Sequence, residues 1–89
     1  MGDSSTAERL AHFARVKEII QAEEMWERVP EESRGFSEKN LEDLVKFAYF
    51  GGFIDMAAVR RFLSLEKKEA RGRIARWYVE VREKGCWLC

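Results

Sequence analysis

The chain has little that would break a helix, cross-link a fold or perform catalysis. It contains one proline, two cysteines and one histidine among 89 residues. It has no Ser/His/Asp arrangement, phosphate loop or dinucleotide fingerprint, so we expect no enzyme and no cofactor. No apolar run approaches the ~18 residues of a membrane span, and the N-terminus lacks a signal-peptide core. These absences predict a cytoplasmic protein that does not enter a membrane.

The two cysteines stand together in Cys86-Trp87-Leu88-Cys89. A Cys-x-x-Cys pair supplies only half of a tetrahedral zinc site, and His12 is the only other residue of the ligand types Cys and His. One chain is therefore expected to hold no metal, although two chains could share an all-cysteine site. Free thiols, with Trp87 packed on the core, or a terminal disulfide are the other interpretations.

The composition favours one small folded domain over residues 1–89. Apolar residues make up 46% and aromatic residues 12% of the chain, which argues against disorder. A chain of this length buries only a modest core, so an oligomer would add stability. Charged residues reach 36%, whereas Asn40 and Gln21 are the only side-chain amides. This composition favours a thermophilic source.

The net charge of zero conceals a split between the two halves. Residues 1–45 carry six basic and eleven acidic side chains, which gives −5, and residues 46–89 carry ten and five, which gives +5. Either the halves bind different partners or they attract each other within one fold.

The spacing of apolar residues predicts helices throughout. The first is expected over residues 5–29, with Ser5 and Glu8 as a capping box and Pro30 beyond its end. Its buried stripe is predicted to be Leu10, Phe13, Val16 and Ile20. Ile19 and Trp26 lie on a second face, which indicates that this helix touches two neighbours.

Three further helices are marked by their ends. Ser37 is a good N-cap for the second helix, which Gly51-Gly52 stops. Asp55 caps a short third helix, Leu63-Ser64-Leu65 forms a turn, and the fourth helix runs from about Glu66 to Lys84. The chain is therefore predicted to be all-α.

The last two helices form a helix–turn–helix unit. The inward residues are predicted to be Val59 and Phe62 before the turn, Leu65 in it, and Ala70, Ile74, Trp77 and Val81 after it. Residues from about 41 to 88 resemble the helix–turn–helix and winged-helix DNA-binding superfamily at Val59, the Phe62-Leu63 end, Leu65, Ala70, Ile74 and the Glu83-Lys84-Gly85 ending. Too few residues follow Gly85 for a wing hairpin. The resemblance implies a four-helix small domain: a tri-helical core over residues 37–89 with an extra N-terminal helix.

The basic side chains of this unit predict where DNA would bind. Helix periodicity turns Lys67, Lys68, Arg71 and Arg76 outwards from the fourth helix, and Arg60 and Arg61 could contact the DNA backbone from the third. Glu66 and Glu69 bring negative charge to the same end, and Glu69 could be offset by Arg73. The alternative interpretation of these charges is a solvated face of paired side chains.

A strip of small residues competes with the DNA interpretation. Gly72, Ala75 and Val79 also point outwards, and glycine inside a helix costs about 1 kcal/mol relative to alanine. Such a strip lets a DNA phosphate or another helix come close, and Ile19 and Trp26 are natural partners for it, within one chain or across two. The first hypothesis is thus a small, dimeric protein that binds double-stranded DNA, such as a transcriptional regulator. The alternative is a protein-interaction or homodimerisation module.

Overall fold

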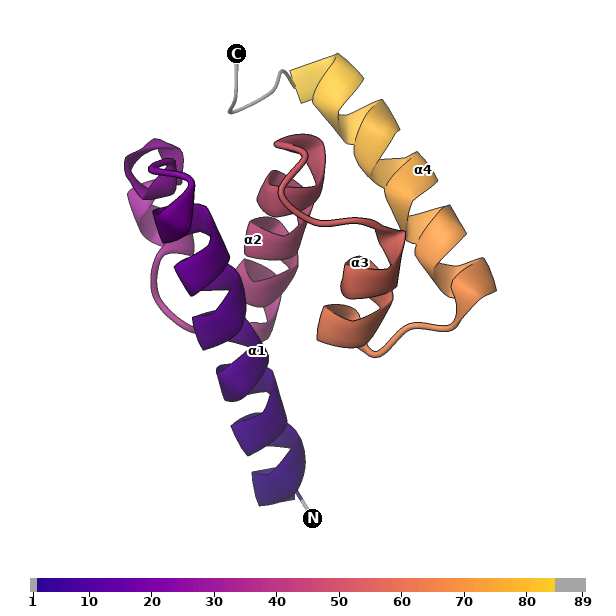
Figure 1. The fold of residues 1–89 in the computed structure, drawn as a ribbon. Coiled ribbons are helices and arrows are strands. Elements are labelled where there is room, and N and C mark those ends of the chain that lie inside the picture. Colours follow the sequence, from indigo (N-terminus) through magenta and orange to yellow (C-terminus); the bar gives the residue numbers. More distant parts are fainter. Residues whose placement is uncertain (1, 85–89) are drawn as a thin grey trace.

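The part of the chain that the structure describes folds into four α-helices, and the prediction of an all-α small domain is confirmed. The computed structural model describes the backbone of residues 2–84 and the side chains of residues 6–84. The helices are α1 (Gly2–Ala22), α2 (Glu38–Phe50), α3 (Met56–Leu63) and α4 (Lys67–Lys84). Two short 3-10 turns, η1 (Trp26–Arg28) and η2 (Glu31–Ser33), connect α1 to α2. In Figure 1, α1 and α4 lie on opposite sides of α2 and α3.

The first helix is shorter at its C-terminal end than the predicted range of 5–29. It ends at Ala22 because Glu24 takes a left-handed conformation with φ of 59°. The amide of Met25 then donates to the carbonyl of Ile20 over 3.1 Å, which closes the helix end. Met25 packs against the core, and its burial stabilises a conformation that glycine would adopt with less strain.

The N-terminal half of α1 also departs from the prediction. The helix begins at Gly2, so Ser5 lies inside it and is not its N-cap. Leu10 is 49% exposed, whereas Phe13, Val16 and Ile20 are buried as expected. The buried stripe is therefore confined to the part of α1 that lies against α2 and α3.

The predicted starts of α2 and α3 are confirmed. The hydroxyl of Ser37 accepts a hydrogen bond from the amide of Asn40 over 3.0 Å. The carboxylate of Asp55 accepts one from the amide of Ala58 over 2.9 Å. Each side chain satisfies an amide that has no partner within the helix, and so fixes where the helix begins.

Helices α2 and α3 end in the same way as α1, with one residue in the left-handed conformation. Gly52 has φ of 80° and Ser64 has φ of 53°. The amide of Phe53 donates to Ala48, and that of Leu65 donates to Arg60, over 2.9 Å in both cases. Ser64 thus takes at the end of α3 the left-handed conformation that Gly52 takes after α2.

All four helices contribute to one core. Its largest fully buried side chains are Trp77, Phe47, Ile20, Leu44, Val16, Val29, Val45 and Val59. The predicted inward residues Val59 and Phe62 of α3, and Ala70, Ile74 and Trp77 of α4, are all buried. Leu65 and Val81 are half-buried.

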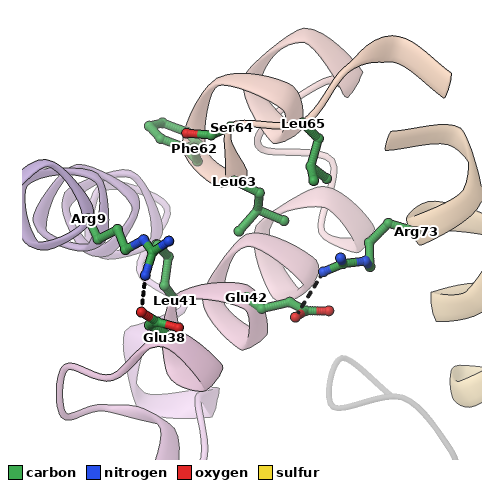
Figure 2. Close-up of a pocket in the computed structure, with 9 residues that line it drawn as sticks. All are labelled: Arg9, Glu38, Leu41, Glu42, Phe62, Leu63, Ser64, Leu65 and Arg73. Carbon is green, nitrogen blue, oxygen red and sulfur yellow. Dashed lines mark hydrogen bonds and ion pairs between the residues drawn. The ribbon is translucent and has the colours of Figure 1, made fainter. Parts of the chain in front are cut away.

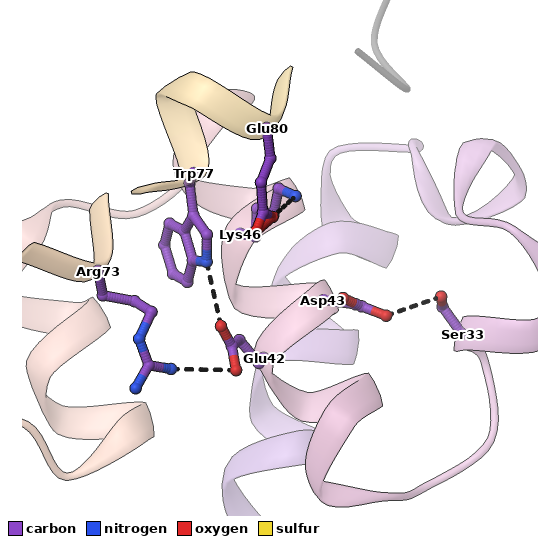
Figure 3. Close-up of polar contacts among 7 residues, drawn as sticks. All are labelled: Ser33, Glu42, Asp43, Lys46, Arg73, Trp77 and Glu80. Atoms are coloured by element: carbon purple, nitrogen blue, oxygen red, sulfur yellow. Dashed lines mark hydrogen bonds and ion pairs between the residues drawn. The ribbon is translucent and has the colours of Figure 1, made fainter. Parts of the chain in front are cut away.

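Polar contacts fix α4 against α2 (Figure 3). The two oxygens of Glu42 bind different side chains of α4: Oε1 lies 3.0 Å from Arg73 Nη1, and Oε2 accepts from Trp77 Nε1 over 3.2 Å. One turn further along α2, Lys46 Nζ lies 2.9 Å from Glu80 Oε1. Arg73 therefore pairs with α2 and not with Glu69, which corrects the sequence prediction.

Candidate nucleic-acid interface

The turn between α3 and α4 is held by its own backbone and by one carboxylate. Only Ser64, Leu65 and Glu66 separate the two helices. The amide of Glu66 donates to Glu69 Oε1 over 3.3 Å, so Glu69 reaches back to the first residue before α4. A carboxylate at this position caps the helix and complements its positive end. The carboxylate of Glu69, which the sequence places near the basic residues, therefore helps to fix where α4 begins.

The six predicted DNA-binding residues are all exposed: Arg60, Arg61, Lys67, Lys68, Arg71 and Arg76. We refer to these six as the basic surface. None of them takes part in the four ion pairs that form among the described side chains. The alternative interpretation, a solvated face of paired side chains, is thus correct about the exposure of these residues and wrong about their pairing, although the charge of Arg76 still helps to lower the pKa of Glu80.

The structure brings five of the six close to the α3–α4 turn. Arg60 and Arg61 lie in the last turn of α3, and Lys67 and Lys68 begin α4 after three residues. Arg71 follows one helical turn later. Arg76 is about 140° away from Arg71 around the helix axis at 100° per residue. It therefore lies on the other flank of α4.

Between these two flanks runs the small-residue strip, which consists of Gly72, Ala75 and Val79. All three are exposed, and Val79 keeps 49% of its surface accessible. A Cβ atom added to Gly72 would meet nothing within 4 Å. Packing within the chain therefore gives no reason for glycine at this position in the helix.

Ile19 and Trp26 do not cover this strip within the same chain. Both are half-buried and pack against the core from α1 and η1. These elements lie across the molecule from α4 (Figure 1). The expectation that they could meet the strip within one chain is wrong, because α2 and α3 separate them; contact across two chains stays a prediction.

Two carboxyl groups near the α2 interface have shifted pKa values of opposite direction. The hydrogen bond from Lys46 lowers the pKa of Glu80, and Lys46, Lys84 and Arg76 add favourable charge. Burial raises the pKa of Asp43, although a hydrogen bond from Ser33 at 3.3 Å and nearby lysines oppose this. Glu80 is thus held ionised on the inner side of α4, where Lys46 neutralises it.

A cavity of about 270 Å³ that no sequence pattern predicts lies beside the turn (Figure 2). Leu63 and Leu65 contribute apolar surface, and two Arg–Glu pairs, Arg9 with Glu38 and Arg73 with Glu42, flank the cavity. Four separate helices line it, so no local motif could have revealed it. Its paired charges balance, which gives it no preference for an anion or a cation.

Within residues 6–84, no cluster of three or more histidine, cysteine or acidic side chains could hold a metal ion. Cys86 and Cys89, which the sequence suggests as a shared zinc site or a disulfide, lie outside the described residues together with Trp87. In the described part of the chain, no helix combines the length and apolar character needed to cross a membrane.

Comparisons with family models, with curated proteins and with solved structures find no match to this chain.

Proposed function

We propose that the chain binds double-stranded DNA through the basic surface, as a small regulator of the helix–turn–helix type would. The observation that carries the proposal is the contrast between two sets of basic side chains. Arg9, Arg15, Lys46 and Arg73 are used in ion pairs with carboxylates of the same chain. The six residues of the basic surface are exposed and form none of these pairs.

The mechanism is electrostatic capture of phosphates, followed by placement of α4 near a groove. Arg60 and Arg61 contact the DNA backbone from the end of α3. Lys67, Lys68 and Arg71 lie in the N-terminal half of α4, the part of a recognition helix that approaches base edges. The absence of a large side chain at Gly72 and Ala75 lets the helix backbone come close to the duplex. Each neutralised phosphate releases condensed counterions, so affinity falls steeply with salt.

The test compares two double variants in fluorescence anisotropy with a mixed-sequence duplex at two salt concentrations. Arg71→Ala with Arg76→Ala should weaken binding by about tenfold and reduce the slope of log K against log salt by about 2. Arg15→Ala with Lys39→Ala removes the same charge from exposed positions outside the basic surface and should change binding little. Absence of wild-type binding to any duplex at low salt would contradict the proposal.

A second function, protein interaction through the small-residue strip, is favoured by Gly72. Glycine in a helix interior costs about 1 kcal/mol relative to alanine, and no neighbour in the chain requires it. A helix or loop of a partner that approaches the backbone of α4 would require it. Ala75→Trp should then lower self-association in sedimentation equilibrium, whereas Ala14→Trp, at an exposed position of α1, should not. Equal masses for both variants and the wild type would contradict this function.

A further inference from the structure

The charge split along the sequence is largely uncompensated within the folded chain. Residues 1–45 carry a net charge of −5 and residues 46–89 a net charge of +5. Among the four ion pairs of the described side chains, only Arg73 with Glu42 joins the two halves. The exposed basic residues of the second half lie on α3 and α4, and α4 lies across the molecule from α1 (Figure 1).

The acidic half gathers its charge where α1 meets η1 and η2. We call this region the acidic corner; its carboxylates are Glu23, Glu24, Glu27, Glu31 and Glu32, all exposed. None of them takes part in the four ion pairs. Arg28 and Arg34 lie in the same segment, so five carboxylates stand against two basic side chains and the corner has an excess of negative charge.

A hollow with an aromatic wall lies in the acidic corner. An open cavity of about 390 Å³ is lined by Gln21, Glu24, Trp26 and Glu27. The ammonium of Lys17 lies 5.2 Å from the centre of the Trp26 ring, which shows that a cation is accommodated beside this ring. Carboxylates beside an indole ring are suited to an arginine or lysine side chain from another molecule.

The outer face of α4 is complementary to this corner in charge and in shape. Arg71 and Arg76 flank the small-residue strip, which spans about 10 Å along the helix. The strip offers exposed apolar surface at Ala75 and Val79 for the indole of Trp26. The flanking arginines are long enough to reach carboxylates beside that ring, as at interfaces where positive and negative surfaces meet.

We infer that the partner of the small-residue strip is a second copy of this chain, which docks its acidic corner on α4. This inference rests on the second proposed function and names its partner. One molecule carries the two surfaces on opposite sides, so the contact is head-to-tail and each copy keeps one free surface of each kind. Because the contact covers Lys68, Arg71 and Arg76, self-association and DNA binding compete for the same residues.

Two substitutions test this arrangement in sedimentation equilibrium at low salt. Wild type should grow in mass beyond two chains as concentration rises, and high salt should reverse this growth. Glu27→Lys breaks only the acidic corner and Arg71→Ala weakens only the α4 face, so each alone should associate about tenfold more weakly. A 1:1 mixture should form a particle of two chains that grows no further, because its two remaining faces are the altered ones and their charges do not complement each other.

The control is Glu8→Lys, the same charge reversal at an exposed position of α1 outside the acidic corner. It should associate like the wild type, and circular dichroism should show equal helix content in all variants. Glu27→Lys leaves the basic surface intact and should bind duplex DNA at least as well as the wild type, which separates this inference from the DNA proposal. The inference is overturned if wild type stays monomeric up to about 1 mM or if the mixture fails to form the two-chain particle. It is also overturned if Ala75→Trp blocks association while Glu27→Lys does not, since the strip would then have another partner.

Discussion

The inner and outer sides of helix α4 differ in the contacts that their residues make within the chain. On the inner side, Trp77 is buried, and Arg73 and Glu80 are held by carboxylate and ammonium groups of α2. On the outer side, Gly72 and Ala75 are exposed and contribute nothing to the core. The fold explains the identity of the inner residues only. The outer residues are therefore the place to look for binding.

The largest expected difference between the two sides is in stability. Trp77→Ala should lower the free energy of unfolding by about 3–5 kcal/mol, because it leaves a cavity and deprives Glu42 of a hydrogen-bond donor. Val79→Ala on the outer side should change it by less than about 0.5 kcal/mol. Urea denaturation followed by circular dichroism measures both. Equal losses would show that the outer side is also part of the stabilising structure.

Substitution of Gly72 is expected to change the free energy of unfolding by a smaller amount and in the opposite direction. Gly72→Ala should raise the free energy of unfolding by about 1 kcal/mol, since alanine is the better helix former and its Cβ meets no neighbour. If the outer side binds a partner closely, the same variant should weaken that contact while it stabilises the monomer. Thermal unfolding and sedimentation equilibrium on the same sample check the two effects, and a gain in stability with unchanged association would argue against close approach at this position.

The smallest expected effect is in the pH dependence of stability. It distinguishes Glu80, in the ionic contact on the inner side of α4, from Asp43, a half-buried carboxyl group elsewhere on α2. The lowered pKa of Glu80 contributes stability at pH above its unfolded value, and this contribution is lost as pH falls through the folded pKa. The raised pKa of Asp43 acts oppositely: its contribution is present below the unfolded value and lost as pH rises through the folded pKa.

Urea midpoints between pH 3 and pH 6 should therefore move apart for two variants. Relative to the wild type, Glu80→Gln should lose stability as pH rises, whereas Asp43→Asn should gain it. Both substitutions remove one titrating carboxyl and keep a side chain of similar size, so each serves as a control for the other. A difference of the same sign for both variants would contradict the assigned directions.

Local signals accounted for most helix boundaries. Ser37 and Asp55 satisfy amides within their own first turn, and Gly52 takes a conformation that glycine adopts without strain. The sequence did not predict the end of α1, because glutamate, the residue type of Glu24, does not indicate a left-handed conformation. Its left-handed conformation is compensated by the packing of Met25 on a core assembled from distant residues.

The features of the candidate sites also differ in whether local sequence or tertiary packing determines them. Helix periodicity correctly placed the six basic residues and the small-residue strip on exposed surface, because their exposure depends only on the direction of the buried stripe of their own helix, α3 or α4. It could not predict that Arg73 pairs with Glu42 instead of Glu69, since Glu42 is brought near only when α2 and α4 pack. Nor could it reveal the cavity beside the turn, which four helices line.

The sequence by itself determined the all-α class, most helix ends and the outward direction of the basic and small residues of α4, because these follow from neighbours within one or two helical turns. Only the tertiary structure decided where α1 stops and which partner Arg73 has. It also decided that α1 and α4 lie on opposite sides of α2 and α3. Each of these depends on contacts between residues far apart in the sequence, and such contacts exist only once the helices have packed around a shared core.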